Sequence, residues 1–437
     1  MTTENEPKVS FGDMIRHVAL AAVVTLAAPC LVHAAPPSIG NVQVKQDASR
    51  LVTISYTLSD APAIVTLSAF TNGVSIGGAL LVNASGALNK RIEPGNAVQT
   101  ITWQPRVTWP DQKITDGSFS VKLTAWALDN PPDYMAVDLT SYSNRIWYAS
   151  ADDVPGTPTN NLYKCDWMLF RRIHAEGVRW RMGVNGDTTG KYTPHTVVLT
   201  NDYYMAIFEG TIGQRTRIVS RTRDENFRPD NKNTYATYEG LRGAAASGYD
   251  WPTDGHAVAE DSVIGKFRTL TGLDSADLPT EAEWEYACRA GSAMCYHWGN
   301  DTSQDTYAQY DWLSGVTGNA DRNRQYGGDG SYRAQKVGLL KPSPWGLYDM
   351  HGNCYELCLD WYSEGDAYCV PGSEVVAPVG PISNANGYRT LHSGSWMHGT
   401  DKARAGNRNG HPASGSSAPY QSVGYRLSCS ADLRNLL

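Results

Sequence analysis

The stretch that decides the fold reads Leu278-Pro-Thr-Glu-Ala-Glu-Trp-Glu-Tyr-Ala287. Thr280 follows a proline and Glu283 stands three residues later, which is the pattern of a capping box at a helix N-terminus. The pattern therefore predicts a helix from Glu281 to Arg289. Glu281 and Glu285 would lie one turn apart while Glu283 points elsewhere, so we interpret these carboxylates as helix-supporting charges and not as a catalytic pair.

Four further segments accompany this helix. They are Val178-Arg-Trp-Arg-Met-Gly183, the segment 202–213, Pro344-Trp-Gly-Leu-Tyr-Asp-Met-His-Gly-Asn353, and Ser393-Gly-Ser-Trp396 with the closing Gly424-Tyr-Arg-Leu427. In this order the motifs resemble the formylglycine-generating-enzyme (sulfatase-modifying-factor) family. The resemblance covers residues 165–430 and implies an α+β, C-type-lectin-like fold with sparse regular structure. Residues 315–331 and 407–417 are rich in Gly, Asn and Ser, so we expect long surface loops there.

Residues 36–150 show a different pattern. The segments 51–58, 63–70 and 119–126 alternate apolar with polar or small residues, and turn formers separate them, which predicts an all-β, Ig-like sandwich. We expect Trp103, Trp109 and Trp126 to fill its core. Residues 151–164, around Pro155-Gly-Thr-Pro158, break both periodicities and are predicted to be a linker.

The N-terminus has the features of a signal peptide. Arg16 and His17 precede an apolar run from Val18 to Val32, and a cleavage site of small residues ends near Ala34, with Met14 as an alternative start. The pattern of residues 1–34 therefore predicts that the protein is periplasmic or secreted. The run is shorter than the roughly 20 residues of a membrane helix, so no membrane span is expected.

Composition and cysteine usage narrow the function classes. The formal net charge is −7 and no basic run is present, which argues against nucleic-acid binding. Seven cysteines follow the predicted cleavage site, so at least one is unpaired even in an oxidising compartment. Cys354 and Cys358 are interpreted as disulfide partners or as small buried side chains.

Members of the family that the motifs resemble bind two metals, copper and calcium. In the family, two cysteines after the Gly-Ser segment bind copper(I), but the sequence from Ser395 to Arg404 contains none and the next cysteine is Cys429. Copper is therefore not expected, because that soft ion needs thiolates. The resemblance also implies calcium, held by Asp349, the carbonyls of Gly352 and Cys354, and the carboxylate of Glu356. The alternative is that Glu356 caps or forms a salt bridge locally.

Histidines and aromatic residues recur in and between the same motifs. His351, His392, His398 and His411 could bind a metal but are interpreted as exposed loop histidines. His398 lies nearest the family's active-site position and is a weak catalytic candidate. Aromatic residues in the motifs are expected to pack in the core: Trp284, Tyr286, Trp345, Tyr348, Trp361 and Trp396.

These features favour an exported, non-copper binding or scaffold module that takes a protein or carbohydrate ligand. Its contact surface would be the final loops from Met397 to Ser422, with the ligand-binding candidates Trp396, His398, Asp401, Lys402, Arg404 and Arg408. Two alternatives stay open. One is an oxidoreductase that modifies a sulfatase or another protein cysteine through a reorganised metal site, and the other is a variable-loop ligand-display protein.

Overall fold

The computed structural model describes residues 35–110, 114, 118–184, 193–220, 236–364, 374–414 and 422–435. The predicted signal peptide, residues 1–34, lies outside these ranges. Within them, no helix combines the length and the apolar character that crossing a membrane requires.

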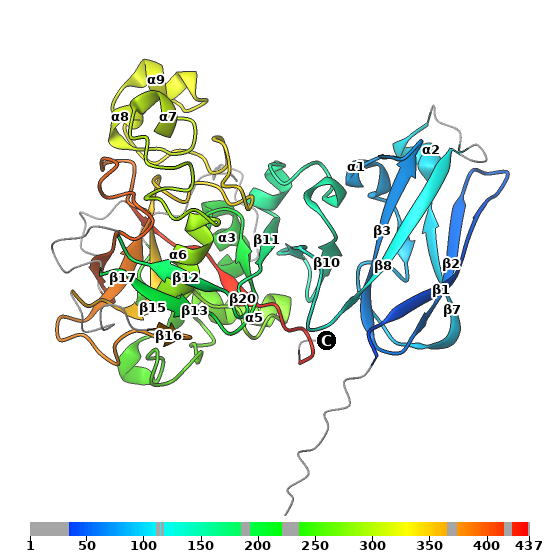
Figure 1. Ribbon diagram of the computed structural model, residues 1–437, viewed down its shortest axis with the longest axis horizontal. Coiled ribbons are helices and arrows are strands. Elements are labelled where there is room, and N and C mark those ends of the chain that lie inside the picture. The colour runs from blue at the N-terminus through cyan, green and yellow to red at the C-terminus, as the bar shows by residue number, and fades with distance from the viewer. Residues whose placement is uncertain are drawn as a thin grey trace, which may run out of the picture. The chain divides into compact units, whose positions relative to one another are not determined.

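The N-terminal part consists of two antiparallel sheets (Figure 1). One sheet contains, in spatial order, β1 (Ser38–Gln46), β2 (Val52–Ser59), β7 (Gly95–Trp103) and β5 (Ser85–Gly86). In the other, β3 (Ala63–Thr71) pairs with β4 (Val74–Ser75), β6 (Arg91–Ile92) and β8 (Phe119–Ala127). Two short helices, α1 (Gly78–Leu81) and α2 (Pro105–Thr108), lie in the connections. The three predicted strands are confirmed as β2, β3 and β8.

Period-two burial explains these sheets. Along β2, every second residue from Val52 to Leu58 is buried, and these side chains cluster with Val65 and Ile101 of the neighbouring strands. Trp103 is fully buried in the cluster and Trp109 is half-buried against it. Trp126 is also half-buried, and its indole Nε1 donates to Thr66 Oγ1 at 2.9 Å.

The main sheet of the C-terminal part starts earlier than the sequence suggested. Its spatial order is β10 (Arg145–Tyr148), β9 (Tyr134–Asp138), β11 (Trp167–Ile173), β14 (Tyr203–Ala206) and β20 (Ser428–Ser430). β9 thus pairs with β11, and β10 pairs with β9. The expected boundary at residue 150 would instead assign both strands to the N-terminal sheets. Alternation of apolar and polar residues shows which side of a strand is buried, but it does not show which strand pairs with it. The alternation alone therefore could not locate this domain boundary.

Residues 151–164 are also more ordered than a linker. They contain two short 3-10 helices, η1 (Ala151–Asp153) and η2 (Asn161–Lys164). Val154 and Tyr163 are buried within this stretch. The prediction of a linker relied on Pro and Gly and missed these apolar anchors.

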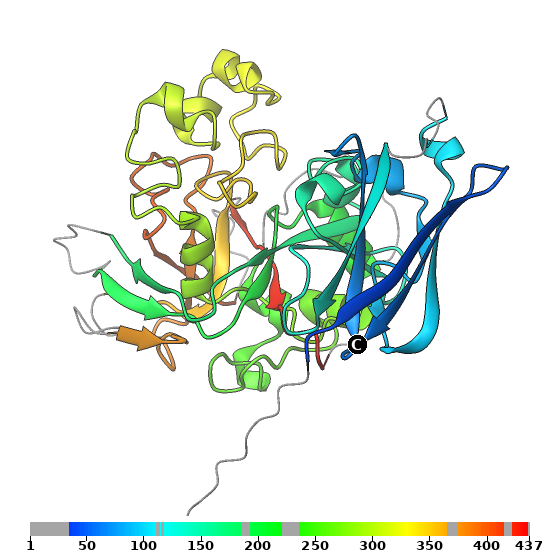
Figure 2. The same ribbon diagram turned by 45° about the vertical axis from the view of Figure 1, so that its right-hand side comes forward.

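Two smaller sheets complete the C-terminal part. The first consists of β12 (Arg179–Met182), β13 (His195–Val198) and β16 (Glu374–Val376), and Figure 2 shows β16 beside β13 although the two are far apart in sequence. The second consists of β18 (Asn409–Pro412), β17 (Tyr388–His392), β15 (Tyr355–Trp361) and β19 (Val423–Gly424). Every residue of β15 is buried, so this strand runs through the interior.

The helices are short. They are α3 (Ile212–Ser220), α4 (Tyr238–Arg242), η3 (Ala245–Ser247), α5 (Val263–Thr271), α6 (Glu281–Arg289), α7 (Gln304–Tyr307), α8 (Ser314–Thr317) and α9 (Ala320–Gln325). Helix α6 confirms the prediction, including the capping box: Glu283 N donates to Thr280 Oγ1 and Thr280 N donates to Glu283 Oε2. It packs against β12, β15 and β17.

The expected surface loops are largely folded. Residues 315–331 include most of α8 and all of α9, and they bury Val316, Thr317 and Asn323. The described part of 407–417 includes β18. Gly, Asn and Ser predicted loops here, but Asn319 caps α9 and the Asn323 carboxamide bonds within the segment, so polar residues build the structure themselves.

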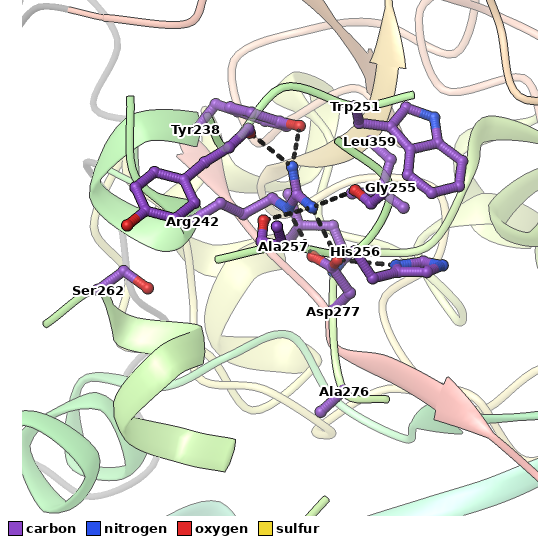
Figure 3. A network of polar contacts seen from close by, with 12 residues as sticks. Tyr238, Arg242, Trp251, Gly255, His256, Ala257, Ser262, Ala276, Asp277 and Leu359 are labelled. Atoms are coloured by element: carbon purple, nitrogen blue, oxygen red, sulfur yellow. Dashed lines mark hydrogen bonds and ion pairs between the residues drawn. The ribbon is translucent and has the colours of Figure 1, made fainter. Parts of the chain in front are cut away.

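A buried ion pair holds the segment that precedes α6 in place (Figure 3). Arg242 Nε and Nη2 donate to the two carboxylate oxygens of Asp277 at 2.8 and 3.1 Å, and both side chains are excluded from solvent. Arg242 also donates to Tyr238 Oη and Gly255 O, and His256 Nδ1 lies 2.9 Å from Asp277 Oδ2. Since Asp277 directly precedes the motif that opens α6, these bonds tie α4 and the loop after it to the start of that helix.

Candidate ligand-binding site around His398

The segment between the paired strands β17 and β18 carries most of the candidate residues. Its entry is a tight turn in which Ser393 and Gly394 both have positive φ, 82° and 74°. A Cβ on Gly394 would meet the backbone of Lys402 at 3.1 Å, so the turn requires glycine. The chain then folds back on itself, which brings residues 394 and 402 into contact.

Backbone hydrogen bonds hold this segment in place. Trp396 N donates to Asn353 O at 2.9 Å, Thr317 Oγ1 donates to Trp396 O at 2.6 Å, and Ser314 N donates to His398 O at 3.0 Å. Ser393 Oγ in turn lies 2.9–3.0 Å from the backbone O and N of Gly352. The segment is therefore fixed by the Met-His-Gly-Asn motif and by α8.

His398 is half-buried on this segment. Its Nδ1 lies 2.7 Å from Ser395 Oγ, and its ring meets Tyr355 edge-on at 5.1 Å between centroids. Partial burial and the nearby charge of Lys402 lower the pKa of His398 below the ordinary 6.5, while Asp401 opposes that shift. The ring is therefore neutral at pH 7, and one of its nitrogens is occupied by a serine hydroxyl.

Trp396 is a buried anchor. It is 7% exposed, which confirms the expectation of core packing, and its ring meets Tyr332 edge-on at 4.8 Å. Tyr332 itself is 55% exposed, and Met397 is 39% exposed. Tyr332 was missed in the sequence, where it stands in a polar stretch without periodicity. We call Tyr332, Met397, His398, Asp401 and Lys402 the His398 surface.

The candidates Arg404 and Arg408 lie outside the His398 surface. Arg404 is exposed, lies near the phenol of Tyr296 and lines a separate pocket. Arg408 is 7% exposed, and its guanidinium forms an ion pair with the fully buried carboxylate of Glu281. A ligand contact of Arg408 stays a prediction, and its ion pair inside the protein does not support it.

Glu281 and three of the four histidines lie in the interior. Glu281 is fully buried, its Oε1 lies 3.1 Å from His392 Nε2, and Arg408 holds its pKa below the ordinary value against burial. His351, His392 and His411 are buried as well, at 3% exposure or less. Of the four histidines weighed, His398 alone is partly accessible in the described structure.

The predicted calcium ligands do not fit that role in this structure. Arg426 donates to both oxygens of Glu356, from Nη2 to Oε1 at 2.7 Å and from Nε to Oε2 at 3.0 Å, and Trp284 Nε1 adds a third bond at 2.6 Å. The guanidinium thus supplies the positive charge that a calcium ion would bring. Asp349 accepts from Gly338 N and keeps one buried oxygen without a partner. Calcium stays a prediction, but the contacts of Glu356 support the alternative of a salt bridge.

Nearby carboxyl groups add to this buried region. Glu209 accepts from Asn353 Nδ2 at 2.6 Å and from Cys354 N at 2.8 Å, so it orders the turn before β15. Burial and the charges of Asp349 and Glu356 raise the pKa of Glu209 well above its ordinary value, which favours its protonated form. Glu209 belongs to the segment 202–213 named above, but no local pattern indicates its contact with Asn353 and Cys354.

The donor set does not fit copper(I) either. Cys354 and Cys358 are fully buried, the first directly before β15 and the second within it, which is consistent with small buried side chains and places neither on a helical turn. Within the described ranges, no three His, Cys, Asp or Glu side chains are grouped so that they could hold a metal ion. The soft thiolate pair that copper(I) requires is missing from the His398 segment.

The C-terminal part is similar to known proteins. A family model described as "Sulfatase-modifying factor enzyme 1-like domain" matches residues 173–431. The formylglycine-generating enzyme of Streptomyces coelicolor is 32% identical over 160 residues, which is 36% of this chain and 47% of that enzyme. A serine/threonine-protein kinase, pkn1 of Chlamydia pneumoniae, is 33% identical over 132 residues, 30% of this chain and 18% of that kinase.

Solved structures give a more distant likeness. Treponema denticola variable protein 1 aligns with a TM-score of 0.43 at 19% identity, over 60% of this chain and 95% of that chain. PvdO from Pseudomonas aeruginosa aligns with a TM-score of 0.45 at 18% identity, over 63% of this chain and 99% of that chain. The chain matches less than half the length of the curated relatives described above. The family model, in contrast, matches more than half of this chain, and the chain belongs to the sulfatase-modifying factor enzyme 1-like family.

Proposed function

We propose that this chain is an exported, non-copper member of its family that binds a protein or carbohydrate ligand through the His398 surface. The observation that carries the proposal is the environment of His398. Where the resemblance implies a thiolate pair, the chain has an imidazole whose Nδ1 is bonded to Ser395 Oγ at 2.7 Å. Such a group can accept or donate a hydrogen bond to a ligand, but it lacks the soft sulfur ligands that copper(I) chemistry uses.

The accessible groups around His398 suit recognition. Tyr332 and Met397 offer exposed apolar area, and the phenol and thioether adapt to different partners. Asp401 and Lys402, whose charges act on His398, add one charge of each sign. An aromatic ring flanked by polar groups is a common feature of surfaces that bind sugars or proteins.

The frame below this surface is rigid. Trp396 is buried, and three backbone hydrogen bonds fix its segment to Asn353, Thr317 and Ser314. A surface that is ordered before binding loses less conformational entropy when a ligand arrives. Export by the predicted signal peptide and an Ig-like identity of the two N-terminal sheets are parts of the same proposal.

Metal analysis of the full chain tests the non-copper assignment. We expect neither copper nor iron at stoichiometric amounts in the wild type or in His398→Ala. Stoichiometric copper or iron that disappears in His398→Ala would overturn the proposal and favour an oxidoreductase with a reorganised metal site.

Ligand screening tests the surface itself. A glycan array and a displayed peptide library serve as probes, with Tyr332→Ala as the variant and Tyr142→Ala as the matched control, since Tyr142 is 68% exposed on another element. We expect Tyr332→Ala to weaken the selected interactions by about tenfold or more and Tyr142→Ala to leave them unchanged. Equal effects of the two changes would contradict a role for the His398 surface.

A further inference from the structure

A second feature, distinct from the His398 surface, is a pocket of about 290 Å³ beside the end of α6. Its lining includes Arg289, Met294, Cys295, Asn300 and Arg404. This volume is at the small end of the range for small-molecule sites. The pocket therefore suits a compact ligand.

The lining is electropositive. None of the described residues that line the pocket carries a carboxylate, whereas two carry guanidinium groups. The charge of Arg289 is balanced by Glu285, with Nη2 to Oε1 at 2.6 Å. Arg404 lies near the Tyr296 phenol, whose pKa burial raises, so this neighbour stays neutral. The described lining residues therefore carry a net positive charge, which favours an anionic ligand.

The pocket also contains a thiol that is held in place. Cys295 N donates to Asn300 Oδ1 at 2.9 Å, and Cys295 O accepts from Ala405 N at 2.8 Å. The Cys295 side chain is half-exposed, whereas Cys288, Cys354, Cys358 and Cys429 are buried.

Cys295 and the Arg289 guanidinium line the same pocket. Reactive cysteines are found in such partly exposed, electropositive surroundings.

We propose that this pocket binds a small anionic disulfide, which Arg404 attracts and which Cys295 captures as a mixed disulfide. The Cys295 thiolate attacks one sulfur of the bound disulfide. The new bond between Cys295 Sγ and that sulfur forms as the ligand's own S–S bond breaks, and the second half leaves as a thiolate that takes up a proton from water. The disulfide is the oxidant, so the exchange is balanced without a metal.

This inference goes beyond the proposed function, because capture in the pocket requires no residue of the His398 surface. The two ideas can therefore fail separately. A protein that binds no glycan or peptide through Tyr332 can still form the adduct at Cys295, and the reverse also holds.

Oxidised glutathione, which carries several carboxylates, is the probe, and 2-hydroxyethyl disulfide is its uncharged counterpart. The full chain is incubated with each, and peptide mapping by mass spectrometry identifies the modified cysteine over time. Cys165→Ser is the matched control for Cys295→Ser, because Cys165 is also half-exposed but lies outside the pocket lining and its Sγ bonds to Asn161 O at 3.2 Å.

We expect glutathione to add fastest at Cys295, with the adduct lost in Cys295→Ser and kept in Cys165→Ser. Arg404→Gln should slow the reaction with oxidised glutathione by about threefold to tenfold and leave that with 2-hydroxyethyl disulfide unchanged, because it removes one positive charge. Arg404 is exposed, so this variant should fold normally. No adduct at Cys295, an equally fast adduct at another cysteine, or equal slowing with both reagents would overturn the proposal.

Discussion

Arg426 and Glu356 form an ion pair in which both side chains are fully excluded from solvent. The guanidinium of Arg426 also donates to the backbone oxygens of Ala206 and Tyr348, at 3.0 and 2.9 Å. One side chain thus joins β14, β15 and the end of the Trp-Gly-Leu-Tyr motif. A buried pair of this kind adds little net stability over an apolar replacement, but losing one member leaves an uncompensated charge.

Removing Arg426 should therefore destabilise the protein strongly. We expect Arg426→Met to lower the free energy of unfolding by about 3–5 kcal/mol in urea denaturation. The control is Arg91→Met, which breaks the exposed pair with Glu93 and should cost less than about 1 kcal/mol. A loss of similar size in both variants would show that Glu356 does not depend on Arg426.

Chelation separates the salt bridge from the calcium prediction. A bound ion stabilises the folded state, so its removal lowers the melting temperature. Because Arg426 occupies both oxygens of Glu356, we expect EDTA and added calcium to change the melting temperature by less than about 1 °C. A fall of several degrees with EDTA that calcium restores would reinstate a calcium site at Asp349 and Glu356.

Local patterns in the sequence predicted local structure well. The capping box identified α6, and period-two alternation identified β2, β3 and β8. Both signals lie within a few residues of the element that they specify. The pairing of β9 with β11 has no such signal, which is why the domain boundary was placed too late.

The sequence did not predict which charged residues are buried. The sequence predicts His392 in an exposed loop and Arg408 at a contact surface, yet both meet Glu281 in one buried cluster, although more than a hundred residues separate them from that carboxylate. A charge becomes tolerable inside a protein only with its partner, and the partner is fixed by the fold. Arg426 stands in the quoted Gly424-Tyr-Arg-Leu427 motif, and a lone charge among apolar residues was the available hint.

Two neighbouring charges shift the pKa of His398 in opposite directions. Lys402 lowers the pKa of His398 and Asp401 raises it. Lys402→Gln should therefore raise the pKa of the imidazole toward its ordinary value, and Asp401→Asn should lower it further. An NMR titration of the ring carbons measures both. Shifts of the same sign would mean that rearrangement, and not charge, controls His398.

The cap of α6 can be tested with a conservative pair of variants. Thr280→Ala removes the oxygen that accepts from Glu283 N, and it should lower the free energy of unfolding by about 1 kcal/mol. Thr280→Ser keeps that oxygen and should recover most of the loss. Equal losses would attribute the effect to the missing methyl group, since Thr280 is largely buried.

Asp360 predicts how stability depends on pH. Burial raises its pKa to about 7, and the charge of Glu281 acts in the same direction. The folded protein therefore holds a proton on Asp360 between about pH 4 and 7, where the unfolded chain has released it, so stability falls as the pH rises through this window. The slope from this one group has an upper bound of about 1.4 kcal/mol per pH unit.

Asp360→Asn removes that proton uptake and leaves a side-chain oxygen for the bond that Glu281 N donates to Asp360 Oδ2. We expect the free energy of unfolding, measured in urea from pH 5 to 8, to decline less steeply in this variant than in the wild type. Asp321→Asn is the control, because its carboxylate is fully exposed. An unchanged slope in Asp360→Asn would mean that other buried carboxyls, such as Glu209 and Asp311, whose pKa values burial also raises, account for the whole decline.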